Sequence, residues 1–520
     1  MSKKTVAITI NCQKPFIRHL DDDNQSKNNM LFNAISDTYL PLLNMFADLE
    51  AEGISFKINM CISPTLCEML ADPVIQQQYI EWLDKLISLG NDEIKNYPKD
   101  NTKKLLAVES LNKAIQNKRD FQEVLNQDIL SKIEYYVRRG NIELLGTTAT
   151  SIFLPHYSDL DEVIRAQIET GLQIHKKYFG IAPEGFYLPY LAYFPGLEFM
   201  LRSYGFNYTI LDSQSLLFAE PQPENGIFTP ARCCNSLAVF GADNEGIEKY
   251  KSNPVYKNKE KDVGYEADAE YLAKHLGTEL KERVSTGFAY WQADGETLYN
   301  KDFAIKEANV AAEDFINSKI ARLSKAQEIQ SEKDLSLICN IDGDLLGGTW
   351  QEGIYWLEAV LRQTFAQEEL ELVFCSDVIK DNQFSLQRVK PYFSAAIGAG
   401  YGENMLDNSN GWMLRYVRKA SERMIDLTSR FKDDTGLKAR SLNLAAKEVL
   451  LAQSGDWQLM ISEKTNPDYA EQRFKESILA FSTVYDSLGS NSISTEWLTR
   501  MEKKHTLFPE MNYMVFSSKQ

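Results

Sequence analysis

Short apolar runs separated by helical patterns recur through the first 380 residues or so, and this alternation limits the possible folds more than any other feature of the chain. Strands that alternate with helices favour βα units around a parallel sheet or barrel. We therefore predict an α/β fold for this part of the chain. The runs are found at residues 5–10, 55–62, 142–149, 185–189, 208–212, 236–240, 335–342 and 371–376.

The segments between the runs have the periodicity of amphipathic helices. Residues 78–90, QYIEWLDKLISLG, place apolar side chains on one face, and we expect this helix to end at Gly90, with a surface loop over 91–104. The pattern is less regular over residues 215–330, which we interpret as an insertion. After about residue 390 the strand pattern stops and helices dominate, which predicts a helical carboxy-terminal domain.

Charge and composition exclude several classes of partner. The 520 residues carry a net charge of −17, which opposes binding to the phosphate backbone of a nucleic acid or to an anionic membrane. No apolar run reaches the roughly 18 residues of a membrane span, and the amino terminus does not read as a secretory signal. The seven cysteines, an odd number spread along the chain, fit reduced thiols in a cytoplasm.

Polar side chains follow several of the predicted strands, where active sites of βα barrels collect. Asn11 and Gln13 follow the first run, Ser151 the third and Tyr190 the fourth. Asp342 ends the run 335–342, although by itself it is equally typical of a carboxylate that caps a turn or helix. Glu352 likewise has the alternative role of a charge in the first turn of a helix.

The sequence does not predict a metal or a cofactor. The five histidines are not spaced as metal ligands, and neither GxGxxG nor GxxxxGK[ST] is present. Four tryptophans, Trp291, Trp350, Trp412 and Trp457, have Gly, Asn, Asp or Gln neighbours. That mixture is used where sugar rings stack on indoles, and packing in the core is the alternative.

Several stretches, in the right order, resemble glycoside hydrolase family 57, and within it the branching-enzyme type. NCQKPFIRH, GNIELLGTTATSIFLP, GFYLPYLAYFPG and IDGDLLGGTWQEG are similar to the motifs of the catalytic domain. NSNGWMLRYVRKASERM and LLAQSGDWQLM are similar to the helical carboxy-terminal module. The resemblance covers most of the chain.

The resemblance implies a distorted (β/α)7 TIM-like barrel over residues 1–385, with the irregular insertion around 215–330, and an α-helical domain over 390–515. It also implies a retaining mechanism on α-glucans, which needs two carboxyl groups about 5 to 5.5 Å apart. Asp342 matches the acid/base, whereas the nucleophilic glutamate of the family falls on Tyr190. Four family histidines fall on Asn11, Gln13, Ser151 and Gly348.

From these substitutions we expect a catalytically impaired relative that still binds an α-glucan or another oligosaccharide. Asn11, Gln13, Ser151, Glu352, Asp456 and the four tryptophans are the expected saccharide contacts. The alternative is an active glycosyl hydrolase or transferase in which Tyr190 is the nucleophile and Glu143 or Asp344 removes its proton. A scaffold protein without a sugar role, or another barrel chemistry such as deacetylation, are further alternatives.

Overall fold

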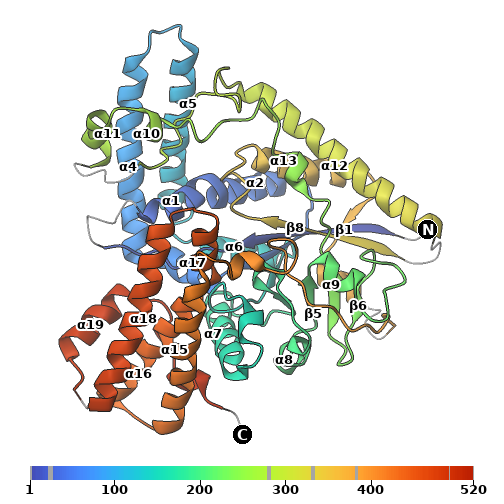
Figure 1. Ribbon diagram of the computed structural model, residues 1–520. Helices are drawn as coiled ribbons and strands as arrows, with labels where there is room; N and C mark the ends of the chain where they lie inside the picture. The colour runs from blue at the N-terminus through green and yellow to red at the C-terminus, as the bar shows by residue number, and fades with distance from the viewer. Residues whose placement is uncertain are drawn as a thin grey trace.

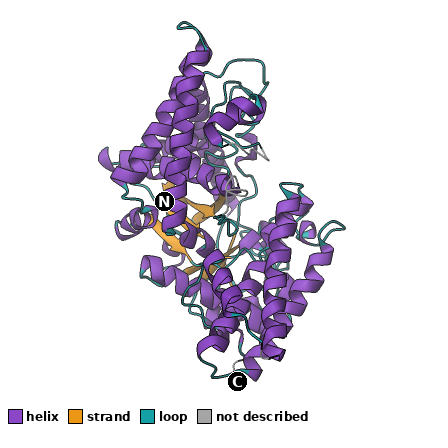
Figure 2. Ribbon diagram, turned by 90° about the vertical axis from the view of Figure 1, so that its left-hand side faces the viewer, coloured by secondary structure: helices purple, strands orange, loops and turns teal. Residues whose placement is uncertain are grey.

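The computed structural model describes residues 3–20, 27–277, 283–329, 334–380, 385–490 and 492–518. Strands lie in the middle of the molecule, between a helical part that contains α4 and α5 and a second one formed by the carboxy-terminal helices (Figures 1 and 2). No helix among these residues combines the length and apolar character of a membrane span.

Two sheets are built mainly from parallel strands. The first has the order β3-β2-β1-β8, with β9 paired to β1. The second has the order β4-β5-β7-β6, in which only β6 is antiparallel. The strands are β1 (Lys4–Cys12), β2 (Ile58–Ile62), β3 (Ile142–Leu145), β4 (Gly185–Tyr187), β5 (Tyr208–Leu211), β6 (Ala231–Arg232), β7 (Ala238–Gly241), β8 (Leu335–Asp342) and β9 (Glu371–Leu372).

All eight predicted runs contain a strand, because buried parallel strands are nearly continuous apolar sequences. Single parallel bridges also connect the two sheets, from Gly146 to Phe186 and from Ala242 to Ile338. The first bridge follows β3 and joins it to β4, and the second follows β7 and joins it to β8. The prediction of an α/β fold with a parallel sheet is therefore confirmed.

Helices cover the sheets and fill the connections between strands. Helices α4 and α5 stand side by side, and the long helix α12 packs against α13 (Figure 1). The α-helices of this part are α1 (Asn29–Ala34), α2 (Leu40–Ala51), α3 (Pro64–Leu70), α4 (Pro73–Asn96), α5 (Thr102–Arg119), α6 (Ile129–Arg138), α7 (Asp161–Phe179), α8 (Leu197–Ser203), α9 (Ser213–Leu217), α10 (Val263–Glu266), α11 (Ala269–Leu276), α12 (Lys301–Ile329), α13 (Gly353–Phe365) and α14 (Cys375–Ile379).

The predicted helix end at Gly90 is wrong, and so is most of the loop predicted over 91–104. Helix α4 continues to Asn96, and α5 begins at Thr102. Gly90 lies inside α4, and a glycine is needed there because a Cβ would come within 2.8 Å of the Phe288 ring and 3.0 Å of Leu111. The glycine thus permits close packing and does not end the helix.

The carboxy-terminal part is helical, as predicted. Helices α15 (Gly411–Arg430), α16 (Gly436–Ala452), α17 (Gly455–Ser462), α18 (Pro467–Ser490) and α19 (Thr495–Lys504) follow one another. Helix α17 begins against the strand region, where the Gly455 amide donates to the Ser151 carbonyl at 2.7 Å. This contact brings the first turn of α17 to the ends of the strands.

Within 215–330, the region interpreted as an insertion, β7 belongs to the second sheet.

Candidate active site

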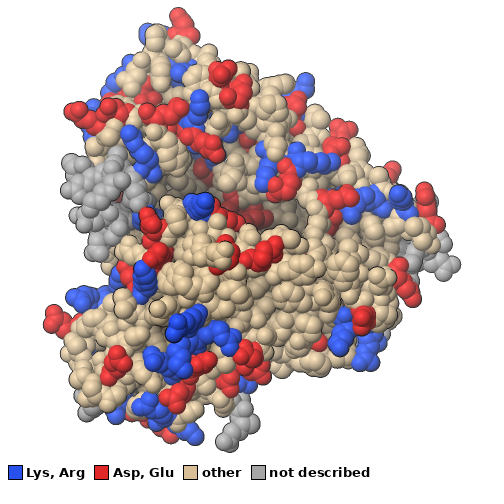
Figure 3. All heavy atoms as spheres, viewed as in Figure 1, with Lys and Arg blue, Asp and Glu red and all other residues tan. Residues whose placement is uncertain are grey.

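A cavity of about 820 Å³ lies at the carboxyl ends of the strands. Residues that follow β1, β4, β5, β7 and β8 line it, together with residues 395–400 and the beginning of α17. Figure 3 shows a hollow in the middle of the visible face, with acidic side chains within it. The cavity is where a βα fold places its active site.

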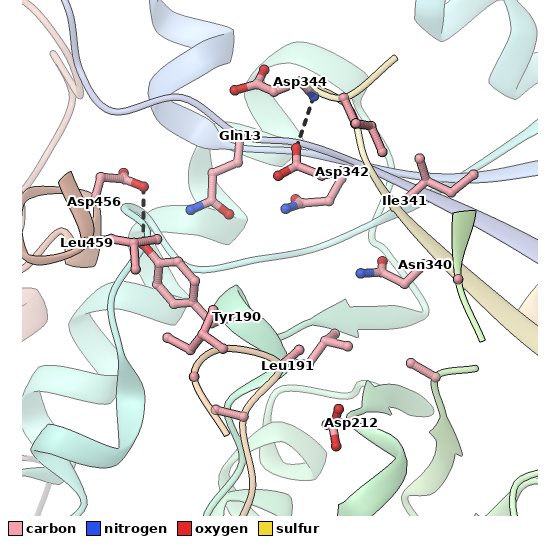
Figure 4. A pocket seen from close by; sticks show the side chains of 18 of the residues that line it. Gln13, Tyr190, Leu191, Asp212, Asn340, Ile341, Asp342, Asp344, Asp456 and Leu459 are labelled. Carbon is pink, nitrogen blue, oxygen red and sulfur yellow. Dashed lines mark hydrogen bonds between the residues drawn. The ribbon is translucent and has the colours of Figure 1, made fainter. Parts of the chain in front are cut away.

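Asp342 is the last residue of β8 and opens into this cavity (Figure 4). Its Oδ1 accepts a hydrogen bond from the Asp344 backbone amide at 3.0 Å. The protein around the carboxyl displaces part of its solvent, and this effect, followed by the negative charge of Asp344, raises the pKa of Asp342 to about 6. A carboxyl group with that pKa is partly protonated near neutral pH, which suits a general acid.

Lys14 follows β1 and forms an ion pair with Asp344, which follows the neighbouring strand β8. Its Nζ lies 2.5 Å from Asp344 Oδ2. The Lys14 charge lowers the pKa of Asp342, so it opposes part of the effect of Asp344. The ion pair therefore fixes the loop after β8 and limits the rise in the pKa of Asp342.

Tyr190 follows β4 in a turn with unusual backbone geometry. Its φ is 59° and its ψ is 15°, which lie in the left-handed region that residues other than glycine rarely adopt. The Tyr190 hydroxyl donates to Asp456 Oδ1 at 3.1 Å (Figure 4). Burial, followed by the charge of Asp456, raises the pKa of Tyr190 well above its ordinary value. The phenol is consequently neutral near pH 7.

Asp456 reaches the cavity from the first turn of α17, and so from the helical part of the chain. Its other oxygen, Oδ2, accepts a hydrogen bond from the Ser454 hydroxyl at 2.8 Å. Burial raises the pKa of Asp456 as well. Strand region and helical part therefore each contribute one member of the Tyr190–Asp456 pair.

The cavity also contains amide side chains with unused acceptors. Asn11, near the end of β1, and Gln13, just after that strand, both line it. Asn340, on β8, donates to the Tyr187 hydroxyl at 3.1 Å. Within the described part of the chain, the Oδ1 atoms of Asn11 and Asn340 have no hydrogen-bond partner. Buried acceptors are nearly always paired, so these two are suited to a ligand that carries hydroxyl groups.

The structure brings Asn11, Gln13, Tyr190, Asp342 and Asp456 together around one cavity. Ser151 does not line it. Ser151 is buried, 2% exposed, where its carbonyl receives the Gly455 amide.

Three other expected saccharide contacts lie in the core and do not line the cavity. Trp350 and Trp457 are each 2% exposed, and the Trp457 indole donates to the Leu451 carbonyl at 2.9 Å. Glu352 is fully buried and accepts a hydrogen bond from the Tyr299 hydroxyl at 2.7 Å. A sugar ring cannot stack on an indole whose faces are covered by protein, so this expectation is corrected for Trp350 and Trp457.

Trp291 and Trp412 are half-buried and likewise do not line the cavity. Lys103 Nζ lies 4.3 Å from the centre of the Trp291 ring. The Trp412 indole donates to the Ser409 carbonyl at 3.1 Å and meets Phe474 edge to face. Both indoles are engaged with other parts of the protein.

The expectation that Glu143 or Asp344 removes the proton of Tyr190 is also corrected. Glu143 accepts hydrogen bonds from Tyr208 at 2.6 Å and Ser376 at 2.9 Å, and Asp344 is paired with Lys14. The hydroxyl of Tyr190 is bonded to Asp456 instead. Asp456, and neither Glu143 nor Asp344, is thus the carboxylate that accepts the hydrogen bond of the Tyr190 hydroxyl.

Sequence reasoning missed five charged residues of the cavity: Lys14, Asp212, Asp243, Glu248 and Glu463. Asp212 and Asp243 follow β5 and β7, so the rule about strand ends would have found both. Lys14 follows β1, so the same rule would have found it as well. No group of three or more His, Cys, Asp or Glu among the described residues is arranged to hold a metal ion.

Two family models match the chain. The first, described as glycosyl hydrolase family 57, matches residues 7–392, and the second, described as 1,4-alpha-glucan branching enzyme, C-terminal, matches residues 416–516. The chain is 24% identical over 481 residues to the 1,4-alpha-glucan branching enzyme TK1436 of Thermococcus kodakarensis, with 85% of this chain and 68% of that protein covered.

Solved structures with the same fold include two that match over nearly the whole chain. The novel alpha-amylase AmyC of Thermotoga maritima has a TM-score of 0.92 and 28% identity, with both chains fully covered. The GH57-type branching enzyme of Pyrococcus horikoshii has a TM-score of 0.88 and 21% identity, with 99% of this chain and 97% of that chain covered. The second likeness is one of fold.

Proposed function

Because the chain belongs to glycosyl hydrolase family 57, we propose that it is a protein of α-glucan metabolism, related to branching enzymes, that binds an α-glucan in the cavity. We propose further that it transfers glucosyl units poorly or not at all. The observation that carries this proposal is the tyrosine at position 190, in the motif after β4 where the resemblance to the family implies the nucleophilic glutamate.

The retaining mechanism needs a carboxylate as nucleophile and a second carboxyl group as acid/base. Asp342 has the raised pKa of an acid/base. Tyr190 supplies a phenol whose pKa lies well above its ordinary value of about 10, so less than about one molecule in a thousand carries the phenolate at pH 7. The cavity thus has an acid without an efficient nucleophile opposite it.

Binding of the saccharide is supported by the lining of the cavity. Asn11 and Asn340 retain unpaired acceptors among the described residues, and Gln13 adds an amide group. Sugar hydroxyls can donate to the unpaired oxygens. A volume of about 820 Å³ lies in the range of about 300–1,000 Å³ of small-ligand sites.

We also propose that the two sheets form one distorted barrel of seven parallel strands, in the order β1-β2-β3-β4-β5-β7-β8. The two single bridges support this arrangement, since they link β3 to β4 and β7 to β8. Two backbone hydrogen bonds accompany them: the Tyr187 amide donates to Gly146 at 2.7 Å, and the Asp243 amide to Ile338 at 2.7 Å. Residues 1–385 would form this domain and 390–515 the helical one.

The test compares the parent, Tyr190→Glu and Tyr190→Gln on amylose, with new reducing ends and branch points as separate readouts. We expect little turnover by the parent and by Tyr190→Gln, and a gain of at least about tenfold in Tyr190→Glu. Robust turnover by the parent would refute the impairment. Calorimetry with maltotriose tests binding separately, and absence of binding would refute the proposed ligand.

One observation favours a second candidate, an active enzyme in which Tyr190 is the nucleophile: the hydrogen bond from its hydroxyl to Asp456. Asp456 would take the phenol proton while the phenolic oxygen bonds to the anomeric carbon, and Asp342 would protonate the departing glycosidic oxygen. Water or an acceptor hydroxyl, deprotonated by Asp342, would then displace Tyr190, which recovers its proton from Asp456. Loss of turnover in Tyr190→Phe, with a glycosyl adduct on Tyr190 by mass spectrometry, would support this candidate over the first.

A cytoplasmic location is part of the proposal. It rests on the number and spacing of the seven cysteines in the sequence.

A further inference from the structure

The segment 393–402, which we call the rim, connects the site of Tyr190 to the outer surface. The Ala396 amide donates to the Tyr190 carbonyl at 2.7 Å, and the Tyr193 amide donates to the Ser394 carbonyl at 2.9 Å. Residues 395–400 line the cavity. The rim is therefore a wall of the site and is held by the turn that carries Tyr190.

Two glycines let the rim lie directly against neighbouring side chains. Gly400 has a φ of 102°, and a Cβ on it would lie 2.4 Å from the Gln214 side chain. Gly402 has a φ of 73°, and a Cβ on it would lie 2.3 Å from the Phe153 ring. Both positions require glycine for space and for backbone conformation. Tyr401 lies between them, next to Gly400, which is the last rim residue that lines the cavity.

Phe393 and Tyr401 flank the lining residues 395–400 in sequence, and their rings are nearly parallel. Their ring planes differ by 8°, and the ring centres are 6.3 Å apart. If the planes are separated by a contact distance of about 3.5–4.0 Å, the centres are displaced sideways by about 5 Å. Most of each ring face is then uncovered by the other ring. Tyr401 is 48% exposed, and Phe393 is half-buried.

We propose that Phe393 and Tyr401 form a stacking platform for the part of an α-glucan that extends out of the cavity. This inference rests on the proposed function, since it takes the same ligand beyond the site of Tyr190 and Asp342. Flat aromatic rings with no charge suit the apolar faces of sugar rings. The platform would favour long chains over short ones, because only a long chain reaches both the cavity and the platform.

The test is calorimetric titration of the full chain with maltotriose and with maltoheptaose. We expect Tyr401→Ala to raise the Kd for maltoheptaose about 5- to 10-fold and to leave the Kd for maltotriose unchanged. Tyr401→Phe, which keeps the ring, should behave as the parent. Tyr265→Ala is the control, because Tyr265 is similarly exposed, at 45%, and lies on α10, outside the rim.

The outcomes separate the two proposals. A parent that binds neither sugar would refute the proposed function and the platform together. A parent that binds both sugars, with Tyr401→Ala leaving the maltoheptaose Kd unchanged or weakening both sugars equally, would overturn the platform alone. The same loss in Tyr401→Phe as in Tyr401→Ala would also overturn it.

Discussion

The buried ion pair between Lys319 and Asp243 connects the stability of the fold to the shape of the cavity. Lys319 Nζ on α12 lies 2.6 Å from Asp243 Oδ2, and the two side chains are only 2% and 1% exposed. Arg322 donates to both oxygens of Asp243, at 2.6 and 2.7 Å. Asp243 lines the cavity directly after β7. Lys319→Met keeps most of the side-chain volume and removes one of the two cations.

Removing one partner of a buried pair costs about 3–5 kcal/mol, because the other charge stays buried. Arg322 still binds Asp243, so we expect the lower end, about 3 kcal/mol. An unfolding entropy of about 2.1 cal/mol/K per residue gives roughly 1.1 kcal/mol/K for 520 residues, so the melting temperature should fall by about 3 °C. Differential scanning calorimetry measures this directly. Maltotriose should also bind more weakly, because Asp243 loses one of its two anchors.

The same helix offers a matched control. Lys249 and Asp314 on α12 form a pair of similar length, 2.9 Å, but with side chains 59% and 60% exposed. Solvent screens such a pair, so Lys249→Met should cost less than about 0.5 kcal/mol. Equal melting temperatures for Lys319→Met and the parent, or equal losses in Lys319→Met and Lys249→Met, would refute the reasoning from burial.

Three further predictions concern single groups. The pKa of Asp342 is raised to about 6 in the folded protein, so ionisation of this group lowers the stability as the pH rises through that value. Asp342→Asn should therefore stabilise the protein against urea at about pH 8 and leave its stability unchanged at about pH 4. We expect a gain of only about 1 kcal/mol, because solvent reaches the group and screens its charge. Gly171→Ala would bring a Cβ within 2.1 Å of the Thr147 carbonyl oxygen and should lower the melting temperature, whereas Gly489→Ala, in open space on α18, should not. Of the seven cysteines only Cys234 is exposed, so a thiol reagent should label one thiol rapidly in the native protein and none in Cys234→Ser.

The strands could be predicted from the sequence because their burial is recorded locally, as continuous apolar runs. The helix end at Gly90 could not, since the reason for that glycine is the ring of Phe288, almost two hundred positions away. A glycine that ends a helix and a glycine that admits a neighbour are identical in a local pattern. The single bridges between the sheets are also long-range contacts, without a local signal.

The candidate site divides in the same way. Asn11, Tyr190 and Asp342 could be predicted because strand ends converge in any βα fold. The partner of Tyr190 could not, because Asp456 arrives from α17, 266 positions away. Trp457 is the next residue along and has the same neighbours in sequence, yet it is buried in the core. Which of two adjacent side chains faces the cavity depends on how α17 packs.

The backbone at Tyr190 sharpens what Tyr190→Glu would report. The left-handed conformation there is held by the rim, through the hydrogen bond from the Ala396 amide, so a glutamate should inherit the same turn. The new carboxylate would share a buried corner with Asp456, and a neighbouring negative charge raises the pKa of a carboxyl group. A nucleophile must be ionised, so turnover should fall at acidic pH, and adding Asp456→Asn should move that fall to lower pH. The pH profile of amylose turnover by the single and double variants measures the shift. If the fall in turnover at acidic pH is the same in both variants, the charge of Asp456 does not raise the pKa of the carboxyl group at position 190. The contact between Tyr190 and Asp456 would then not be matched by an electrostatic interaction between the two carboxyl groups.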